Sequence, residues 1–235
     1  MDFSSIQLIT FDCYGTLIDW ETGILGSLRT LLGNRPGLDN EQLLSLYAEI
    51  ESQIESGPYM AYRAVLGRTA EEIGRRLGVS ILPGDAQRFA ESLRLWKPFP
   101  DTVDALRALA RRYKLAIISN VDDDLFASTH TLLRTSFEFV VTAQQVRSYK
   151  PSEKNFQEAL QRAERAGIRK DEILHVAQSL YHDIAPANAL GLKTVWVDRR
   201  FDKSGAGATK AGTATPTLRV RSMAELAEKI APPEE

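Results

Sequence analysis

The chain has 235 residues, of which 43% are hydrophobic and 26% are charged, and its formal net charge is −2. This composition is typical of a globular protein with a substantial core, and the near-neutral charge argues against nucleic acid or an anionic membrane surface as the main partner. No apolar stretch reaches the roughly 20 residues of a membrane-spanning helix, and the N-terminus does not resemble a secretion signal. We therefore predict a cytoplasmic protein that binds neither nucleic acid nor membranes.

The first element is a buried strand that ends on a carboxylate. The apolar run 8–11 precedes Asp12, and Gly15 then allows a sharp turn or a close approach to a ligand. From about residue 21 to residue 96 the pattern changes, because apolar residues recur at three- and four-residue spacing with little strand signal. This spacing predicts a helical segment, with helices near residues 24–32, 43–50, 59–77 and 86–95.

Beyond the proline-rich crossing 96–100, strands and helices alternate. We expect strands at 114–119, 137–141, 173–177, 193–197 and 218–220, and helices at 101–112, 123–133, 152–166, 184–190 and 223–230. Such alternation predicts a parallel sheet with helices on both faces, and the Gly- and Thr-rich stretch 201–217 is expected to be a mobile loop. The predicted fold class is α/β, with a parallel-sheet core at 1–18 and 97–235 and a helical insertion at 19–96.

Polar side chains follow the ends of the predicted strands. They are Asp12, Tyr14, Thr16, Ser119, Asn120, Lys150, Gln178, Ser179 and Asp183. Taken singly, Asp12 could close a turn, Lys150 could be a solvated surface residue and Asp183 could begin a helix. Because ligands of parallel sheets bind beyond the carboxyl ends of the strands, we expect these side chains to meet at one edge and form a nucleophile site.

Four segments in this order resemble the motifs of the haloacid dehalogenase superfamily. They are Phe-Asp-Cys-Tyr-Gly-Thr-Leu at 11–17, Ile-Ser-Asn at 118–120, Tyr-Lys-Pro at 149–151 and His-Val-Ala-Gln-Ser-Leu-Tyr-His-Asp at 175–183. The resemblance covers the whole chain. It implies a Rossmann-like core, a helical cap formed by the insertion, and an aspartate nucleophile at Asp12.

Two departures from the phosphatases of this superfamily bear on the reaction. The resemblance places a proton-donating aspartate at the position of Tyr14 and a magnesium-binding aspartate at the position of Gln178, and neither residue here is an acid. A phosphate ester needs that acid and a cation, whereas a halide leaves unaided as a stable anion. The sequence therefore favours displacement of a halide from carbon without a cofactor or a metal.

The first motif resembles that of the type II 2-haloacid dehalogenases in particular. That resemblance implies catalytic roles for Asp12, Thr16, Ser119, Lys150 and Asp183: Asp12 forms an ester with the substrate, Asp183 orients the water that hydrolyses it, and Lys150 keeps Asp12 ionised. The implied substrate is a small 2-haloalkanoic acid, which is a carboxylate, and the product is a 2-hydroxy acid.

The expected substrate-binding residues are Tyr14, Asn120, Ser179 and Arg63. In the type II enzymes an arginine of the cap helps to bind the substrate, and the matching helix of this chain has none, so Arg63 further along is the candidate substitute. Two alternatives stay open. One is a magnesium-dependent phosphatase that retains Asp12 and Asp183 as ligands, and the other is a binding protein without turnover. The oligomeric state is also open, a homodimer included.

Overall fold

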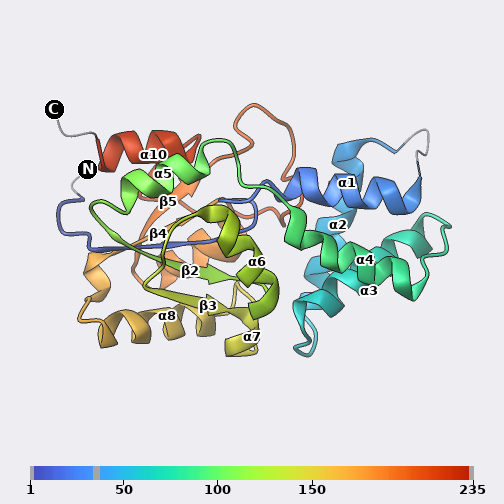
Figure 1. Cartoon of the computed structure of the whole chain (residues 1–235), viewed down its shortest axis with the longest axis horizontal. Helices are drawn as coiled ribbons and strands as arrows, with labels where there is room; N and C mark the ends of the chain where they lie inside the picture. The colour runs from blue at the N-terminus through green and yellow to red at the C-terminus, as the bar shows by residue number, and fades with distance from the viewer. Residues whose placement is uncertain (1–2, 34–37, 233–235) are drawn as a thin grey trace.

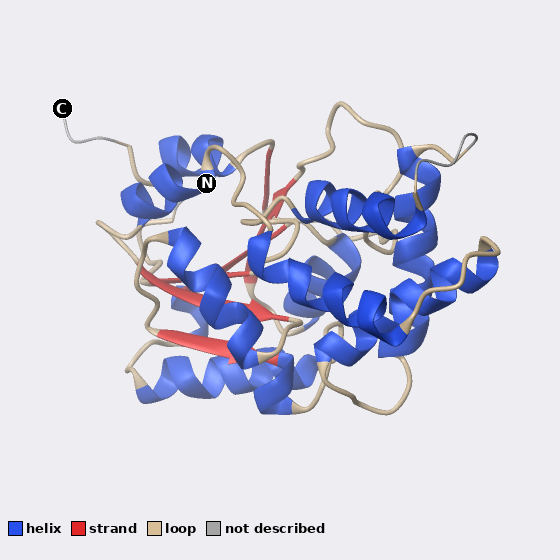
Figure 2. Cartoon of the chain, turned by 45° about the vertical axis from the view of Figure 1, so that its right-hand side comes forward, coloured by secondary structure: helices blue, strands red, loops and turns tan. Residues whose placement is uncertain are grey.

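The computed structural model describes residues 3–33 and 38–232. Its centre is an all-parallel sheet in the order β3-β2-β1-β4-β5-β6, with helices on both faces (Figure 1, Figure 2). The strands are β1 (Leu8–Phe11), β2 (Lys114–Ser119), β3 (Phe139–Thr142), β4 (Ile173–Ala177), β5 (Lys193–Val197) and β6 (Leu218–Val220). The predicted α/β fold class is confirmed, and strand order reverses at β1, next to both β2 and β4.

Each face of the sheet buries its own hydrophobic cluster. Ile9 and Phe11 of β1 belong to the larger cluster, whereas Leu8 belongs to the second one, as the two-residue period of a strand requires. The helices of the core are α5 (Thr102–Leu109), α6 (Asp123–Leu133), α7 (Ala143–Val146), α8 (Glu153–Arg165), α9 (Ala185–Ala189) and α10 (Met223–Ile230). Helices α5 and α10 cover one face and α8 covers the other (Figure 1).

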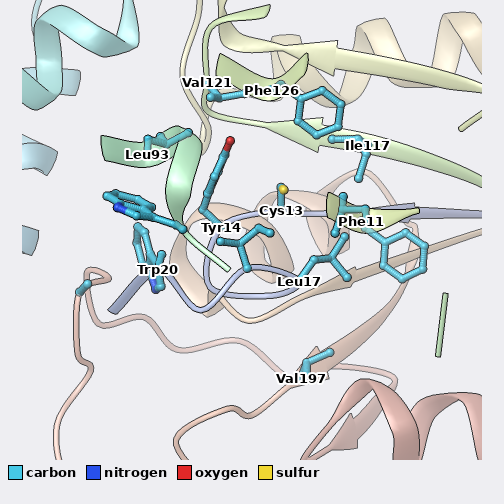
Figure 3. Packing of buried hydrophobic residues seen from close by; sticks show 14 of the residues in the cluster. Phe11, Cys13, Tyr14, Leu17, Trp20, Leu93, Ile117, Val121, Phe126 and Val197 are labelled. Carbon is cyan, nitrogen blue, oxygen red and sulfur yellow. The ribbon is translucent and has the colours of Figure 1, made fainter. Parts of the chain in front are cut away.

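The chain leaves β1 through a tightly packed turn. Figure 3 shows side chains of the turn packed against those of neighbouring elements; the labelled residues are Phe11, Cys13, Tyr14, Leu17, Trp20, Leu93, Ile117, Val121, Phe126 and Val197. Cys13 is fully buried among them and has no disulfide. It therefore serves as a small core residue, and the turn that carries Asp12 is rigidly supported.

The helical insertion, residues 20–95, follows β1 and packs beside the carboxyl edge of the sheet (Figure 1). It comprises α1 (Trp20–Leu32), α2 (Asn40–Glu55), α3 (Tyr62–Arg76), α4 (Pro83–Ser92) and a 3-10 turn (Leu93–Leu95). Its helices are amphipathic: α1 buries Ile24, Leu28 and Leu32 at four-residue spacing. None of the helices within 3–33 and 38–232 is long and apolar enough to cross a bilayer.

Polar contacts on two elements of the core help to join the insertion to it. The buried carboxylate of Asp122 accepts hydrogen bonds from the backbone N–H groups of Tyr62 (2.8 Å) and Arg63 (3.0 Å). These are free N–H groups at the start of α3, which has no side-chain cap of its own. On the opposite side Arg200 forms ion pairs with Glu21 of α1 and Glu41 of α2. The insertion is thereby fixed over the edge of the sheet.

Differences from the expected elements are confined to segment ends and short turns. Strand β3 begins at Phe139 rather than 137, and the four-residue helix α7 was not predicted. The helix expected at 184–190 is α9, and a π-helical turn that was not predicted, Leu180–Ile184, precedes it. The stretch 201–217 has no regular secondary structure, although Ala208 and Thr209 within it are buried.

Candidate active site

The ammonium group of Lys150 lies between two carboxylates at the carboxyl edge of the sheet. Its Nζ donates hydrogen bonds to Oδ1 of Asp12 (2.8 Å), to Oδ1 of Asp183 (2.6 Å) and to the backbone oxygen of Ile118 (2.9 Å). All three charged side chains are buried. Residues from three distant parts of the sequence therefore form one compact ionic cluster, which defines the centre of the site.

The second oxygen of Asp12 is held by Thr16. The Thr16 hydroxyl donates to Oδ2 of Asp12 (2.6 Å) and accepts from the backbone N–H of Gln178 (2.8 Å). The turn from Asp12 to Thr16 requires glycine at position 15. Gly15 has a φ of +92°, and a Cβ there would lie 2.8 Å from the indole nitrogen of Trp20. Both carboxylate oxygens of Asp12 are thus fixed in direction before any substrate arrives.

Asp183 is oriented by a histidine for which the sequence suggested no role. His175 Nε2 lies 3.1 Å from Oδ1 of Asp183, and its Nδ1 lies 2.9 Å from the Thr10 hydroxyl. An ionised carboxylate can only accept, so Nε2 carries a proton and donates to Asp183, while Nδ1 and the Thr10 hydroxyl share the second hydrogen bond. His175 is the first residue of the fourth motif, and its partner Thr10 lies opposite it on the neighbouring strand β1. The motif was therefore a signal for His175, whereas the contact with Thr10 depends on the pairing of β1 with β4.

Burial and charge act in opposite directions on this cluster. Burial would lower the pKa of Lys150, but the adjacent Asp12 and Asp183 outweigh it and raise that pKa. Burial likewise pushes the pKa of Asp183 upward, yet Lys150 and His175 outweigh it and lower that pKa. For Asp12 burial prevails and the pKa is raised, although Lys150 opposes the shift. Asp12 is consequently a poorly solvated carboxylate beside a permanent positive charge.

The second motif contributes one positioning residue and one unpaired donor. The Asn120 side chain forms two hydrogen bonds with the backbone of Lys150. Its amide oxygen accepts from the Lys150 N–H (2.8 Å), and its amide nitrogen donates to the Lys150 carbonyl oxygen (3.2 Å). The Ser119 hydroxyl is buried and lines the pocket, and it has no hydrogen-bond partner among the described residues. A buried donor without a partner is costly, so the Ser119 hydroxyl is a pocket-lining donor that is free for a ligand.

Two other residues that we expected to bind substrate, Ser179 and Tyr14, line the pocket but have hydrogen-bond partners within the protein. Ser179 lines it and bonds His182 and Thr209. Tyr14 also lines it, but its hydroxyl is paired with Thr129 (2.8 Å).

Arg63, the proposed substitute for the cap arginine, is not among the residues that line the pocket. Its guanidinium donates to Asp124 (2.6 Å) at the surface, where the Arg63 side chain is 41% exposed. The structure thus gives Arg63 a bridging role between the insertion and α6.

Helix α2 supplies the wall of the pocket opposite the ionic cluster. Glu51 and Glu55 line this wall, together with the aromatic side chains of Trp20 and Tyr62. The sequence motifs did not point to these residues. One signal was present, however, because Glu51 falls on the buried stripe of α2 with Leu44 and Tyr47, where an acidic side chain is unexpected.

The residues of the site do not suit the divalent cation that phosphatases of this fold family use. Within residues 3–33 and 38–232 no three His, Cys, Asp or Glu side chains form a group that could hold a metal. Asp12 and Asp183 already share the ammonium of Lys150, and Gln178 provides a neutral amide where a hard cation favours a carboxylate. The positive charge of this site is therefore supplied by the protein itself.

Comparisons with known proteins identify the family of this chain. A model of the haloacid dehalogenase-like hydrolases matches residues 6–191. Haloacetate dehalogenase H-2 of Moraxella sp. (strain B) is 27% identical over 211 residues, which are 85% of this chain and 90% of that protein.

Two solved structures share the fold. L-2-haloacid dehalogenase from Xanthobacter autotrophicus with chloropropionic acid covalently bound has a TM-score of 0.77 at 19% identity, over 96% of this chain and 98% of that one. The HAD-hydrolase YfnB from Bacillus subtilis bound to magnesium has a TM-score of 0.78 at 17% identity, again over 96% and 98%. Likeness of fold therefore does not distinguish a dehalogenase from a magnesium-bound hydrolase. The family model, by contrast, matches most of the chain. This chain belongs to the haloacid dehalogenase-like hydrolase family.

Proposed function

We propose that this hydrolase releases halide from a small 2-haloalkanoic acid, with Asp12 as the nucleophile and without a metal ion. The observation that carries the proposal is the position of the Lys150 ammonium, 2.8 Å from Asp12 and 2.6 Å from Asp183. A cation built into the protein can stabilise a carboxylate nucleophile, but it does not provide the acid that an alkoxide leaving group needs. Tyr14, at the position of that acid, is paired with Thr129.

In the first step a carboxylate oxygen of Asp12 attacks the α-carbon of the substrate. The carbon–halogen bond breaks, the halide departs with the bonding electrons, and an ester joins Asp12 to the acid. Burial removes water from Asp12, which strengthens it as a nucleophile. The unpaired hydroxyl of Ser119 is the donor we assign to the substrate carboxylate.

In the second step water attacks the carbonyl carbon of the ester. Asp183 accepts the proton from this water through Oδ2, which has no hydrogen-bond partner among the described residues, while Oδ1 stays bound to Lys150 and His175. Lys150 stabilises the negative charge that develops on the carbonyl oxygen. The ester then breaks between that carbon and the substrate oxygen, which takes up the proton held by Asp183. This releases the 2-hydroxy acid and leaves one water oxygen on Asp12, which returns to a carboxylate by losing the remaining water proton to solvent.

Halide release from chloroacetate and 2-chloropropionate, with and without a chelator, tests this reaction. We expect turnover that the chelator does not change and that Asp12→Asn abolishes, while the exposed control Asp104→Asn retains it. Turnover in heavy-oxygen water should place the isotope in the peptide that contains Asp12. Chelator-sensitive hydrolysis of a phosphate ester, with no halide release, would instead support the phosphatase alternative.

A further inference from the structure

The wall of the pocket that faces the ionic cluster is acidic. Glu51 and Glu55 are one helical turn apart on α2, so both side chains project from the same face, and both line the pocket that contains Asp12 and Lys150. The only lysine or arginine among the described residues that line this pocket is Lys150, which already pairs with Asp12 and Asp183. The two glutamates therefore face the cavity without a positive partner.

Glu51 is held as an acceptor at a defined position. Its Oε1 receives hydrogen bonds from the phenols of Tyr47 and Tyr62, each 2.6 Å long. Within the part of the chain that the structure describes, neither Glu51 nor Glu55 has an ion pair with a lysine, arginine or histidine within 4.0 Å, and the Glu51 side chain is buried. Burial raises the pKa of Glu51 to about 7 and raises the pKa of Glu55 above its usual value. A positively charged ligand in the cavity would therefore stabilise the ionised forms of both carboxyls.

A second feature of the pocket points to the same ligand. The Ser119 hydroxyl, 2% exposed and unpaired, lines the core side of the cavity, where it can donate to an anionic group. On the insertion side, the rings of Trp20 and Tyr62 accompany the two carboxyls. Aromatic faces next to carboxylates are a favourable environment for an ammonium group.

We propose that the substrate carries a protonated amine that binds against Glu51 and Glu55, so that it is an amino-substituted 2-haloacid rather than a simple one. This inference rests on the proposed function for the reaction at the α-carbon and adds the identity of the remote substituent. The carboxylate and the halogen-bearing carbon lie on the core side near Ser119 and Asp12, and the ammonium lies on the α2 side. A purely anionic substrate would leave both glutamates without a partner.

Pairs of substrates that differ only in this charge test the proposal. The first pair is 3-amino-2-chloropropanoate, which carries the ammonium, and 2-chlorobutanoate, which has a methyl group of similar size in its place. The second pair, 4-amino-2-chlorobutanoate and 2-chloropentanoate, repeats the comparison with one more carbon. Since hydrogen bonds to charged groups contribute roughly 1.5–3 kcal/mol, we expect kcat/KM to favour the amine of at least one pair by about tenfold or more. Glu55→Gln should bring that ratio close to one.

Glu49→Gln is the matched control, because Glu49 is on the exposed side of the same helix and pairs with Arg76. It should keep the preference, and Glu55→Asp should keep part of it. Equal rates for amine and methyl substrates in both pairs, or a preference that Glu55→Gln leaves unchanged, would overturn the proposal.

Binding separates this inference from the reaction on which it rests. If no 2-chloro acid releases halide, the proposed function fails, and calorimetry with the hydroxy acids then decides the inference alone. Tighter binding of 3-amino-2-hydroxypropanoate than of 2-hydroxybutanoate, lost in Glu55→Gln, would support the amine site. Equal binding of the two would refute it.

Discussion

Replacing Lys150 by methionine tests the electrostatic basis of the site. The substitution keeps most of the aliphatic volume and removes the ammonium, so Asp12 and Asp183 become two buried carboxylates without a counter-ion. Removing one partner of a buried ion pair costs about 3–5 kcal/mol, because the remaining charge stays buried and unpaired. We expect the free energy of unfolding of Lys150→Met to fall by that amount at pH 8, and kcat/KM to fall by at least about a hundredfold.

The pH dependence of this loss has a definite sign. In the natural protein the pKa of Asp183 is lowered, so its contribution to stability is present above its unfolded pKa, about 3.9, and is lost only as the pH falls through the folded value. The raised pKa of Lys150 gives a contribution that persists below about pH 10.4. In Lys150→Met both carboxyl pKa values should rise, so the variant loses stability as the pH rises from 5 to 8.

Urea unfolding of both proteins at pH 5 and pH 8 measures this effect. The quantity to compare is the stability difference between variant and natural protein, since groups that titrate equally in both cancel. The exposed Lys154→Met is the control and should change stability by less than about 0.5 kcal/mol. The double variant Lys150→Met with Asp183→Asn should recover part of the stability but none of the activity. A loss below about 1 kcal/mol, or a loss equal at both pH values, would refute the ionic cluster.

Three further predictions concern single side chains. Asp183→Asn should slow hydrolysis of the ester more than its formation, so mass spectrometry should detect the covalent adduct on Asp12; an unmodified, fully active variant would contradict this role. Tyr14→Phe should lower the free energy of unfolding by about 1 kcal/mol because Thr129 loses its partner, and adding Thr129→Val should recover most of it. Burial raises the pKa of Glu51 to about 7, so its neutral form stabilises the fold at low pH and about 3 kcal/mol is lost as the pH rises from 4.5 through 7. Glu51→Gln should abolish that loss, and parallel stability curves for the two proteins would contradict it.

The core fold could be predicted from the sequence because its strands are short, continuous and largely buried. β1, β2, β4 and β5 occur at the expected residues, since a strand covered on both faces is apolar throughout and ends where polar residues begin. The ends of the insertion helices were less predictable. α2 extends to Asn40 and Glu55 through polar residues, where periodicity gives no signal and capping decides the boundary.

Part of the site was equally accessible to sequence reasoning. Asp12, Lys150 and Asp183 follow strand ends, and a parallel sheet brings such residues to one edge, where hydrogen bonds of 2.8 and 2.6 Å now join them. Which residues of the insertion face the pocket could not be predicted from the sequence in this way. Whether Arg63 faces the cavity depends on the rotation of α3, which the contact between Asp122 and the first N–H groups of that helix determines.

The core and the insertion would control different properties of the proposed reaction. The ionic cluster is built entirely from residues of the core, at 12, 150 and 183, and in that proposal it supplies the nucleophile and directs hydrolysis of the ester. The opposite wall comes mainly from α2, which Arg200 fixes to the core through Glu41. Substitutions at Glu55 should consequently change which substrate binds while leaving the ionic cluster intact. The same core could thus serve 2-haloacids whose remote substituents differ in charge, provided that the helix facing it carries the complementary side chains.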